Sequence, residues 1–156
     1  MKRTIVCAGI AVALLAAVPA FATPVPQGGV TLEDMAGILS KAGMPATITK
    51  DSNGRRIVTS KAVGVNFDVY LYQCNQDNRC ADIQFAAGWT NAHVNAERVN
   101  EWNTTKRFLR VYYKPGDILW AEQDARVLRG TIENINECLA FWKVLLGEFK
   151  TFMKLN

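Results

Sequence analysis

The stretch between Val65 and Trp89 constrains the fold more than any other part of this chain. Apolar residues alternate with polar ones in two runs, which is the period-two pattern of strands with one buried face. A polar turn separates the runs, and Cys74 and Cys80 flank that turn. An antiparallel hairpin with these cysteines opposite each other brings apolar residues together on one face and polar residues on the other. The pairs are Leu71 with Ile83, Val69 with Phe85 and Phe67 with Ala87 on the apolar face, and Tyr72 with Asp82 and Tyr70 with Gln84 on the polar face.

The same register predicts a disulfide between Cys74 and Cys80, because facing residues of an antiparallel pair lie within the distance that a disulfide spans. Two cysteines without nearby histidines do not supply the four ligands of a structural zinc site. Their spacing also differs from the C-x-x-C motif of redox enzymes. Cys138 lies on the apolar side of the last expected helix, so we expect it to be a buried free thiol.

The remaining patterns predict an α+β domain with an antiparallel sheet of about five to six strands and flanking helices. The expected order is helix, three or four strands, helix, two strands, helix. Thr31 is a suitable cap for the first helix. The expected elements are a helix over 31–42, strands over 46–50 and 55–60, the hairpin over 65–89, a helix over 93–103, strands over 107–113 and 118–125, and a helix from 130 onward.

The last expected helix has an apolar stripe that covers roughly half of its circumference, whereas a helix on one sheet needs about 100°. Two explanations fit the surplus. The helix lies in a deep groove of its own domain, or it also contacts a second subunit. Phe141, Leu145 and Phe152 lie on the side away from Ile132 and Leu139, so they are the candidate contact of a homodimer.

Residues 1–22 have the three parts of a secretory signal peptide. Lys2 and Arg3 supply the positive end, residues 5–18 are apolar, and residues 20–22 read Ala-Phe-Ala, a small-x-small cleavage site. The apolar run is shorter than the ~20 residues of a membrane span, although an uncleaved anchor is the alternative. We expect export to the periplasm or beyond the cell, with no membrane span left after cleavage.

The mature chain is expected to begin with a loose lead-in over residues 23–29, which contain two prolines and a pair of glycines. Residues 30–156 then form a single domain. The full chain has 18 Lys and Arg against 14 Asp and Glu. Two of those bases fall in the leader, so the mature chain is too nearly neutral for a nucleic-acid partner. No motif predicts a metal or another cofactor.

The residues also lack a recognisable catalytic motif. His93 is the one histidine of the chain, and nothing in the sequence places it beside a nucleophile and a carboxylate, as a hydrolytic triad requires. There is no G-x-S-x-G turn and no phosphate-binding glycine loop. Scattered acidic residues leave a small hydrolase as the alternative, which would need a cleft with His93 or two close carboxylates.

One segment resembles a known family. Residues 99–103 read Val-Asn-Glu-Trp-Asn and residues 107–112 read Arg-Phe-Leu-Arg-Val-Tyr. This pattern is similar to the signature of the YbjN family, whose members are described as bacterial sensory-transduction regulators with a fold like that of type III secretion chaperones. The resemblance covers about residues 28–153. It implies an α+β domain that acts by binding, and the chaperone-like fold also implies dimers.

The resemblance leaves two interpretations of its central residues. In one, Asn103 caps the helix, Asn100 bonds a strand and Trp102 fills the core. In the other, Asn100, Trp102, Asn103 and Arg107 form a recognition patch. The function expected is therefore an exported, non-enzymatic binding module, an envelope chaperone or regulator that contacts a protein partner.

Overall fold

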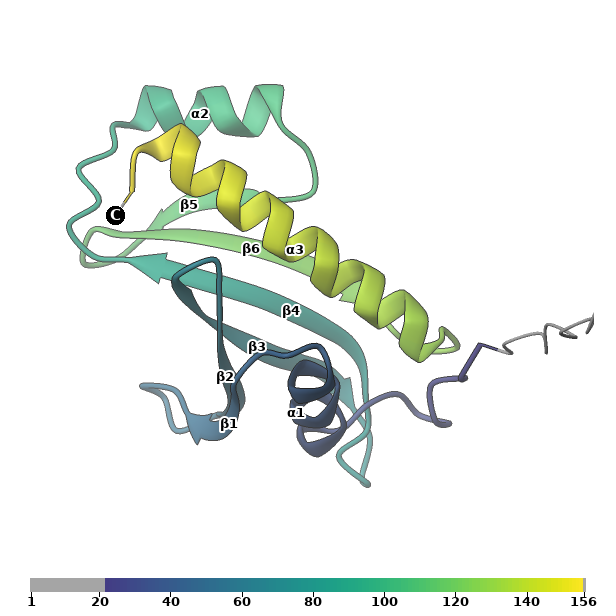
Figure 1. Ribbon diagram of the computed structural model, residues 1–156. Coiled ribbons are helices and arrows are strands. Elements are labelled where there is room, and N and C mark those ends of the chain that lie inside the picture. The colour runs from purple at the N-terminus through teal and green to yellow at the C-terminus, as the bar shows by residue number, and fades with distance from the viewer. Residues whose placement is uncertain (1–21, 156) are drawn as a thin grey trace, which may run out of the picture.

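The computed structural model describes residues 22–155. It consists of three helices and a six-stranded antiparallel sheet, and it confirms the expected α+β class and element order (Figure 1). The elements are α1 (Leu32–Lys41), β1 (Ala46–Lys50), β2 (Arg56–Ala62), β3 (Val65–Cys74), β4 (Cys80–Trp89), α2 (Ala96–Thr105), β5 (Arg110–Lys114), β6 (Ile118–Arg126) and α3 (Ile132–Met153).

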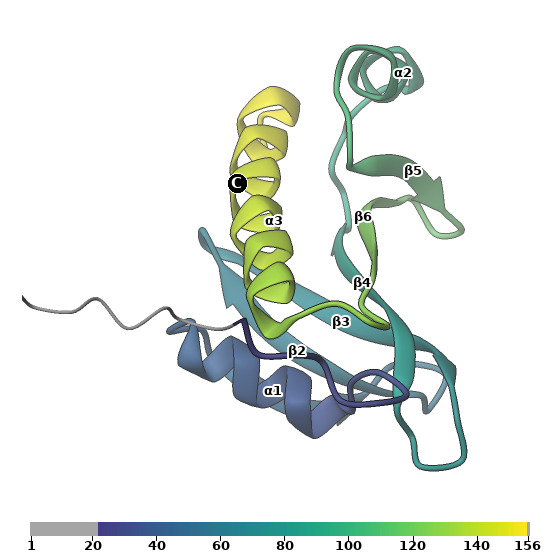
Figure 2. The same ribbon diagram turned by 90° about the vertical axis from the view of Figure 1, so that its right-hand side faces the viewer.

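The strands lie in the order β1-β2-β3-β4-β6-β5. The chain leaves β4, passes through α2 to the sheet edge at β5, and returns along β6 between them. Helices α1 and α3 cover one face of the sheet, here called the helix face, whereas α2 lies along the β5 edge (Figures 1 and 2). None of the described helices covers the opposite side, here called the open face (Figure 2).

The core lies between α3 and the helix face of the sheet. Phe67 of β3, Phe85 of β4 and Trp142 of α3 form its centre, with ring centroids 5.7–6.2 Å apart. All three are essentially inaccessible to solvent. The wide stripe of α3 is thus explained mainly by its own domain, because seven of its residues are buried there. They are Ile135, Leu139, Trp142, Leu145, Leu146, Phe149 and Met153.

The central hairpin has the register expected from the alternation of its residues. Leu71 faces Ile83, and Cys74 faces Cys80, to which it is joined by a disulfide. Polar residues of the same two strands pair on the open face, where Tyr72 lies opposite Asp82. Cys138 is a free thiol as expected, but it is only half-buried.

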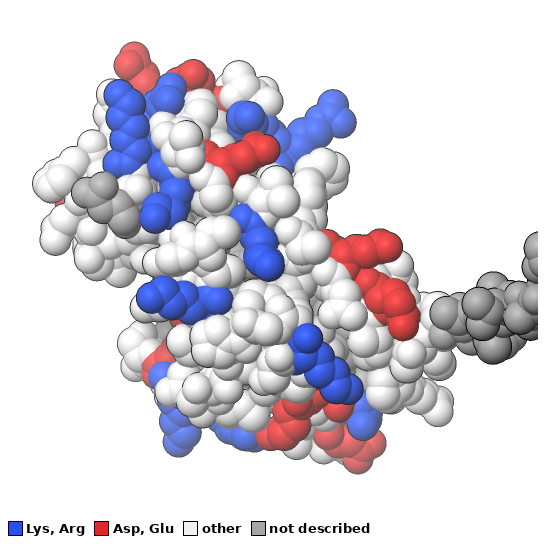
Figure 3. All heavy atoms as spheres, viewed as in Figure 1, with Lys and Arg blue, Asp and Glu red and all other residues white. Residues whose placement is uncertain are grey.

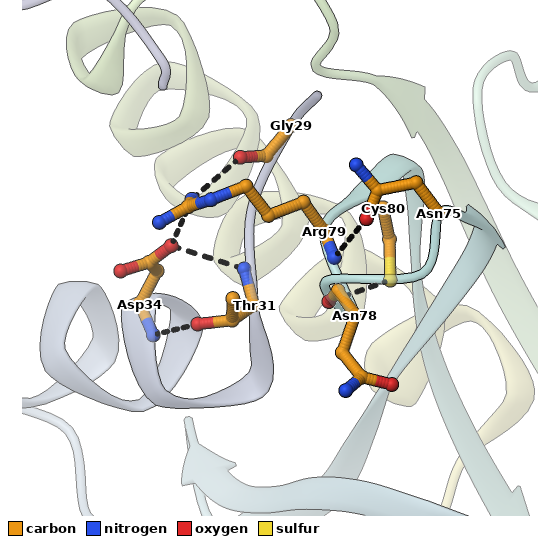
Figure 4. Close-up of polar contacts among 7 residues, drawn as sticks. All are labelled: Gly29, Thr31, Asp34, Asn75, Asn78, Arg79 and Cys80. Carbon is orange, nitrogen blue, oxygen red and sulfur yellow. Dashed lines mark hydrogen bonds and ion pairs between the residues drawn. The ribbon is translucent and has the colours of Figure 1, made fainter. Parts of the chain in front are cut away.

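The tip of this hairpin is bound to the start of α1 (Figure 4). The Arg79 guanidinium donates to the Gly29 carbonyl and to the Asp34 carboxylate, each at 3.1 Å. Asp34 also accepts from the Thr31 amide at 3.0 Å, and the Thr31 hydroxyl accepts from the Asp34 amide. Arg79 therefore joins the disulfide loop to the capping box of the first helix.

The segment before α1 is held by the domain, which corrects the expectation of a loose lead-in over residues 23–29. Val25 is buried and its amide donates to the Gly130 carbonyl. Pro24 bridges to Thr131, and Val30 bridges to Cys80. The sequence did not indicate these bonds because they join segments far apart in the chain. The expected leader lies outside the described residues, apart from its last position.

The second helix and the fifth strand begin later than the sequence predicted. Backbone φ is positive at Asn91 and His93, so the helix starts at Ala96 with Asn95 as its cap. Phe108 also has a positive φ of 69°, and the strand therefore starts at Arg110 instead of residue 107. Hydrophobic spacing does not report such local left-handed geometry, which is uncommon for residues other than glycine.

Among residues 22–155, no helix has the length and apolar character that crossing a membrane requires.

Candidate functional site

The open face of the sheet carries a group of aromatic and polar side chains outside the core. Alternation along each strand directs these residues away from α1 and α3. Pairing across β3, β4, β6 and β5 then brings them together in rows. The residues are Tyr70 and Tyr72 of β3, Gln84, Ala86 and Gly88 of β4, Trp120, Glu122 and Asp124 of β6, and Arg110, Tyr112 and Lys114 of β5.

Glu122 is the centre of this face, and it is only 4% exposed. Its carboxylate accepts hydrogen bonds from the Tyr112 hydroxyl at 2.7 Å and from the Trp120 indole N–H at 2.5 Å. The Arg110 guanidinium forms an ion pair with its other oxygen. Burial by itself would raise the pKa of Glu122, but these three donors outweigh it and lower the pKa below 4.5. The carboxylate is therefore charged and fully bonded at neutral pH.

The tyrosine beside it stays protonated. Burial and the hydrogen bond to Glu122 raise the pKa of Tyr112 to about 12. The bond to Glu122 likewise raises the pKa of Arg110 above its usual value. The group as a whole is thus a fixed arrangement of donors around one acid.

A second group of bonds lies across β3, β4 and β6. The Tyr72 hydroxyl donates to the Gln84 side-chain oxygen at 3.1 Å, and the Gln84 amide nitrogen donates to Asp124 at 2.8 Å. The Arg55 guanidinium lies over the ring of Tyr72, 4.1 Å from its centroid, and 5.3 Å from that of Tyr70. Burial and the nearby Asp68 raise the pKa of Tyr70 to about 12. Both tyrosine rings therefore lie beside a cation.

Small residues of β4 form a trough between these two groups. Gly88 faces Trp120 across the sheet, and a Cβ atom at Gly88 would lie 2.4 Å from the Trp120 ring. Only glycine allows the indole to lie this close to the strand. A cavity of about 210 Å³ follows the trough, with Asp68, Ala86 and Trp120 among its lining residues. Lys114 lies over the same indole, 3.5 Å from the ring centroid.

This arrangement suits recognition better than proton transfer. A general acid needs a raised pKa near the working pH, whereas that of Glu122 is lowered. Aromatic rings and arginines, in contrast, are enriched where proteins bind one another. On the helix face, basic and acidic side chains are interspersed among the other residues (Figure 3).

The structure does not assemble the recognition patch that the sequence suggested. Trp102 is fully buried and its indole N–H donates to the Leu109 carbonyl at 3.1 Å. The Asn103 amide is bound to Val111, donating to its carbonyl at 2.8 Å and accepting from its amide at 3.1 Å. Asn100 and Arg107 are exposed. The prediction of a patch made of these four residues is therefore corrected, because Trp102 lies in the core. The residue that bonds the strand is Asn103 and not Asn100.

The three candidate dimer residues also have different surroundings. Leu145 is buried in its own chain at 6% exposure, which corrects its assignment to an outer surface. Phe152 is half-buried against Trp102 and lies under the Arg98 guanidinium, 3.6 Å from its ring centroid. Phe141 is 39% exposed. Helical spacing alone did not distinguish the core side of α3 from its outer side because apolar residues occupy both.

The hydrolase alternative requires a cleft that holds His93 or two close carboxylates. His93 is exposed and lines a hollow of about 260 Å³ beside Tyr113 and Asp117. Another hollow, of about 550 Å³, is lined by Glu122 and Asp124 among others. It therefore holds two carboxylates, but three donors occupy one of them. Within residues 22–155, no cluster of three His, Cys, Asp or Glu side chains could hold a metal ion.

Sequence reasoning missed the open face as a site. The alternation of apolar and polar residues had assigned Tyr70 and Tyr72 to the polar face of the hairpin. The same two-residue period in 110–114 and 118–124 would have added Tyr112, Trp120 and Glu122 to that face. What the sequence lacked was the strand order, because β6 lies between β4 and β5 only through a non-sequential pairing.

Residues 31–138 match the sequence profile of the YbjN family, described as a putative bacterial sensory transduction regulator. No curated protein sequence matches the chain.

Proposed function

We propose that this chain, which belongs to the YbjN family, is an exported regulator or chaperone that acts by binding another protein through the open face of its sheet. One observation carries the proposal. Four aromatic side chains lie on a face that none of the described helices covers, and hydrogen bonds to Glu122 and Gln84 already orient the polar atoms of three of them, Tyr72, Tyr112 and Trp120. A partner would meet a surface whose rotamers are held in place, which lowers the entropy lost on binding.

The export part of the proposal rests on the leader-like residues 1–22 and agrees with the chemistry of the domain. Disulfides such as Cys74–Cys80 persist in oxidising compartments and are rare in the bacterial cytosol. Expression of the full chain with a C-terminal tag tests this part. Intact-mass measurement of the envelope fraction should show a chain that lacks the first 22 residues, and an uncleaved chain would contradict export by this route.

The binding part is tested with a surface variant. We expect the double substitution Tyr72→Ser, Tyr112→Ser to abolish capture of partners from envelope extract, because it removes two rings and the donors that orient Gln84 and Glu122. Val144→Ser, at a 56% exposed position of α3, is the matched control on the helix face. Mass spectrometry of the captured proteins provides the readout, and circular dichroism checks the fold. A partner retained by the double variant but lost by the control would contradict the proposal.

Self-association remains a separate prediction from the resemblance. Phe141 and Phe152 are the two candidate residues with accessible surface. Light scattering of the purified protein tests it, and a monomer at high micromolar concentration would contradict it.

A further inference from the structure

The sheet edge next to α2 is only partly occupied. Strand β5 pairs with β6 from Lys114–Ile118 to Arg110–Glu122 and then ends. Strand β6 continues for four more residues, 123–126, which pair with β4 on one side. On the other side no described strand pairs with them. We call this unoccupied edge the notch.

Backbone groups of β6 point into the notch. Asn103 binds both the amide and the carbonyl of Val111, so these groups point away from β6. In an antiparallel ladder, pairs that exchange hydrogen bonds alternate with pairs that do not. Val111 and Ala121 therefore form a non-bonded pair, and the bonded pair is Arg110 with Glu122. The same alternation directs the amide and carbonyl of Asp124 into the notch.

The side chains around the notch provide a second, independent observation. Gln123 is 93% buried, and its side-chain oxygen has no hydrogen-bond partner among the described residues. The residue lines the 550 Å³ hollow, together with Phe108 and Leu109. A buried acceptor without a donor is rare and costly in a folded protein. A ligand with a suitable donor would satisfy it.

Exposed apolar surface lies beside the same hollow. Phe108 is 68% exposed, and its ring packs edge-on against Phe141 of α3 with centroids 5.3 Å apart. Phe108 has a positive φ, and β5 begins only two residues later, at Arg110. A bulky residue rarely adopts this backbone conformation, and such conformations are concentrated at binding sites.

The charges around the notch distinguish its two sides. Asp124 is exposed, and it receives a hydrogen bond from neutral Gln84, while the nearby cations have other partners. Arg110 pairs with Glu122, and Arg126 pairs with Asp82 at 3.1 Å. Asp124 is thus an acid on the open-face side, whereas Gln123 and Phe108 belong to the side toward α3.

We propose that the notch binds an extended segment of a partner protein, which adds to the sheet as a short strand beside β6, antiparallel to it like the other strand pairs of the sheet. A basic side chain of the segment lies opposite Asp124. The flanking side chains are ones such as threonine, whose hydroxyl donates to the free Gln123 oxygen and whose methyl group packs toward the Phe108–Phe141 pair. A strand added at a sheet edge forms hydrogen bonds with the free backbone groups of that edge. Its alternate side chains contact the domain and give specificity. The inference rests on the proposed binding function and names the form of its partner.

The test uses a blocked hexapeptide of alternating threonine and lysine, with two N-methylated forms. In an antiparallel arrangement, a residue opposite Asp124 exchanges backbone bonds with it, so the lysine amides bond β6 and the threonine amides point away. Methylation of the lysine amides should weaken binding at least tenfold. Methylation of the threonine amides should change the dissociation constant by less than threefold. Fluorescence polarisation of the labelled peptides measures both.

Amide exchange of the ¹⁵N-labelled full protein then locates the peptide. Addition of the unmethylated peptide should slow exchange at Asp124 at least tenfold. Asp124→Asn should weaken binding several-fold at low salt, with a smaller effect at high salt because the attraction is screened. Asp124→Ser is the second variant, and it should behave like Asp124→Asn if charge is the cause.

Several results would overturn the inference. These are the absence of binding at millimolar peptide, equal binding of the two methylated peptides, or protection at Tyr70 and Tyr72 in place of Asp124. Protection of the Asp124 amide in a dimer without peptide would assign the notch to a second copy and would also overturn it. If the peptide fails while the Tyr72, Tyr112 variant still loses its partner, the notch is wrong and the proposed function stands.

Discussion

The two faces of the sheet are built from the same strands and are both rich in aromatic residues, yet they hold their rings in different ways. On the helix face, Phe67 and Phe85 pack against Trp142 without any polar contact of their own. On the open face, Tyr112 and Trp120 reach a shared carboxylate through their polar atoms. Packing secures the first set, and hydrogen bonds secure the second.

This difference shows how one sheet can provide both stability and an accessible surface. Rings in a core gain free energy from burial, about 25 cal/mol per Å² of apolar area. Rings on the open face keep part of that area exposed, and Tyr72 is 38% exposed. Their fixed orientation comes from Glu122 and Gln84 instead. The folded state can therefore keep apolar area available for a partner.

The largest expected effect is that of Phe85→Ala on the helix face. Removal of this fully buried ring should lower the free energy of unfolding by about 3–5 kcal/mol, through lost burial and the remaining cavity. Urea unfolding followed by circular dichroism measures it. Tyr70→Ala, on the adjacent strand and the opposite face, is the matched comparison and should cost at most about 1.5 kcal/mol. Equal losses would mean that the two faces do not differ as described.

Glu122→Gln on the open face should cost about 1–3 kcal/mol at pH 7, because a buried charged acceptor loses its bonds to Arg110, Tyr112 and Trp120. The folded protein lowers the pKa of Glu122. Its stabilising contribution is therefore fully present above about pH 4.5 and is lost as pH falls through the lowered pKa.

Urea midpoints at pH 7 and pH 3 test this sign. The difference between the original protein and Glu122→Gln should shrink at the lower pH. A difference that is the same at both pH values would show that the carboxylate charge has no part in orienting the rings.

Gly88→Ala should have a smaller effect, about 1 kcal/mol, since its Cβ would meet the Trp120 ring at 2.4 Å and the half-exposed indole can move. The indole should leave the trough and shift its fluorescence emission toward longer wavelength. Gly37→Ala is the control, because a Cβ there meets no atom within 4 Å. An unchanged emission spectrum in Gly88→Ala would contradict the contact between Trp120 and the trough.

Phe108→Ser should have the smallest effect on stability, within about 0.5 kcal/mol, because the side chain is 68% exposed. The same change should weaken binding of the alternating peptide several-fold. Thermal unfolding and polarisation measure the two effects on one sample. A large loss of stability would assign Phe108 to the core instead of to the notch.

The sequence predicted the central hairpin more closely than any other part of the fold. Two cysteines and two alternating faces all required a single register, and the pairing of Leu71 with Ile83 confirms it. The boundaries near His93 and Phe108 were wrong because a positive φ leaves no trace in hydrophobic spacing. Local patterns of this kind report burial and not backbone geometry.

The candidate site was harder to predict for a different reason. The open face requires knowledge of which strands are neighbours, and the non-sequential position of β6 is a tertiary property. For Trp102 the error was to expect a buried side chain on the surface. The unusual Trp-Asn pair suggested a surface patch, but the indole is buried in the core and the side-chain amide of Asn103 bonds a strand.

The bond between Asn103 and Val111 has a consequence for how these molecules can assemble. A carboxamide has the same donor and acceptor as a peptide group, so Asn103 stands at the β5 edge as a neighbouring strand of a single residue. An open-ended polymer of sheets needs two free edges on each molecule, one to give and one to receive. This amide occupies the edge at Val111, so β5 cannot accept a strand of a neighbouring molecule there, and the notch beside β6 is the part of that edge that stays open.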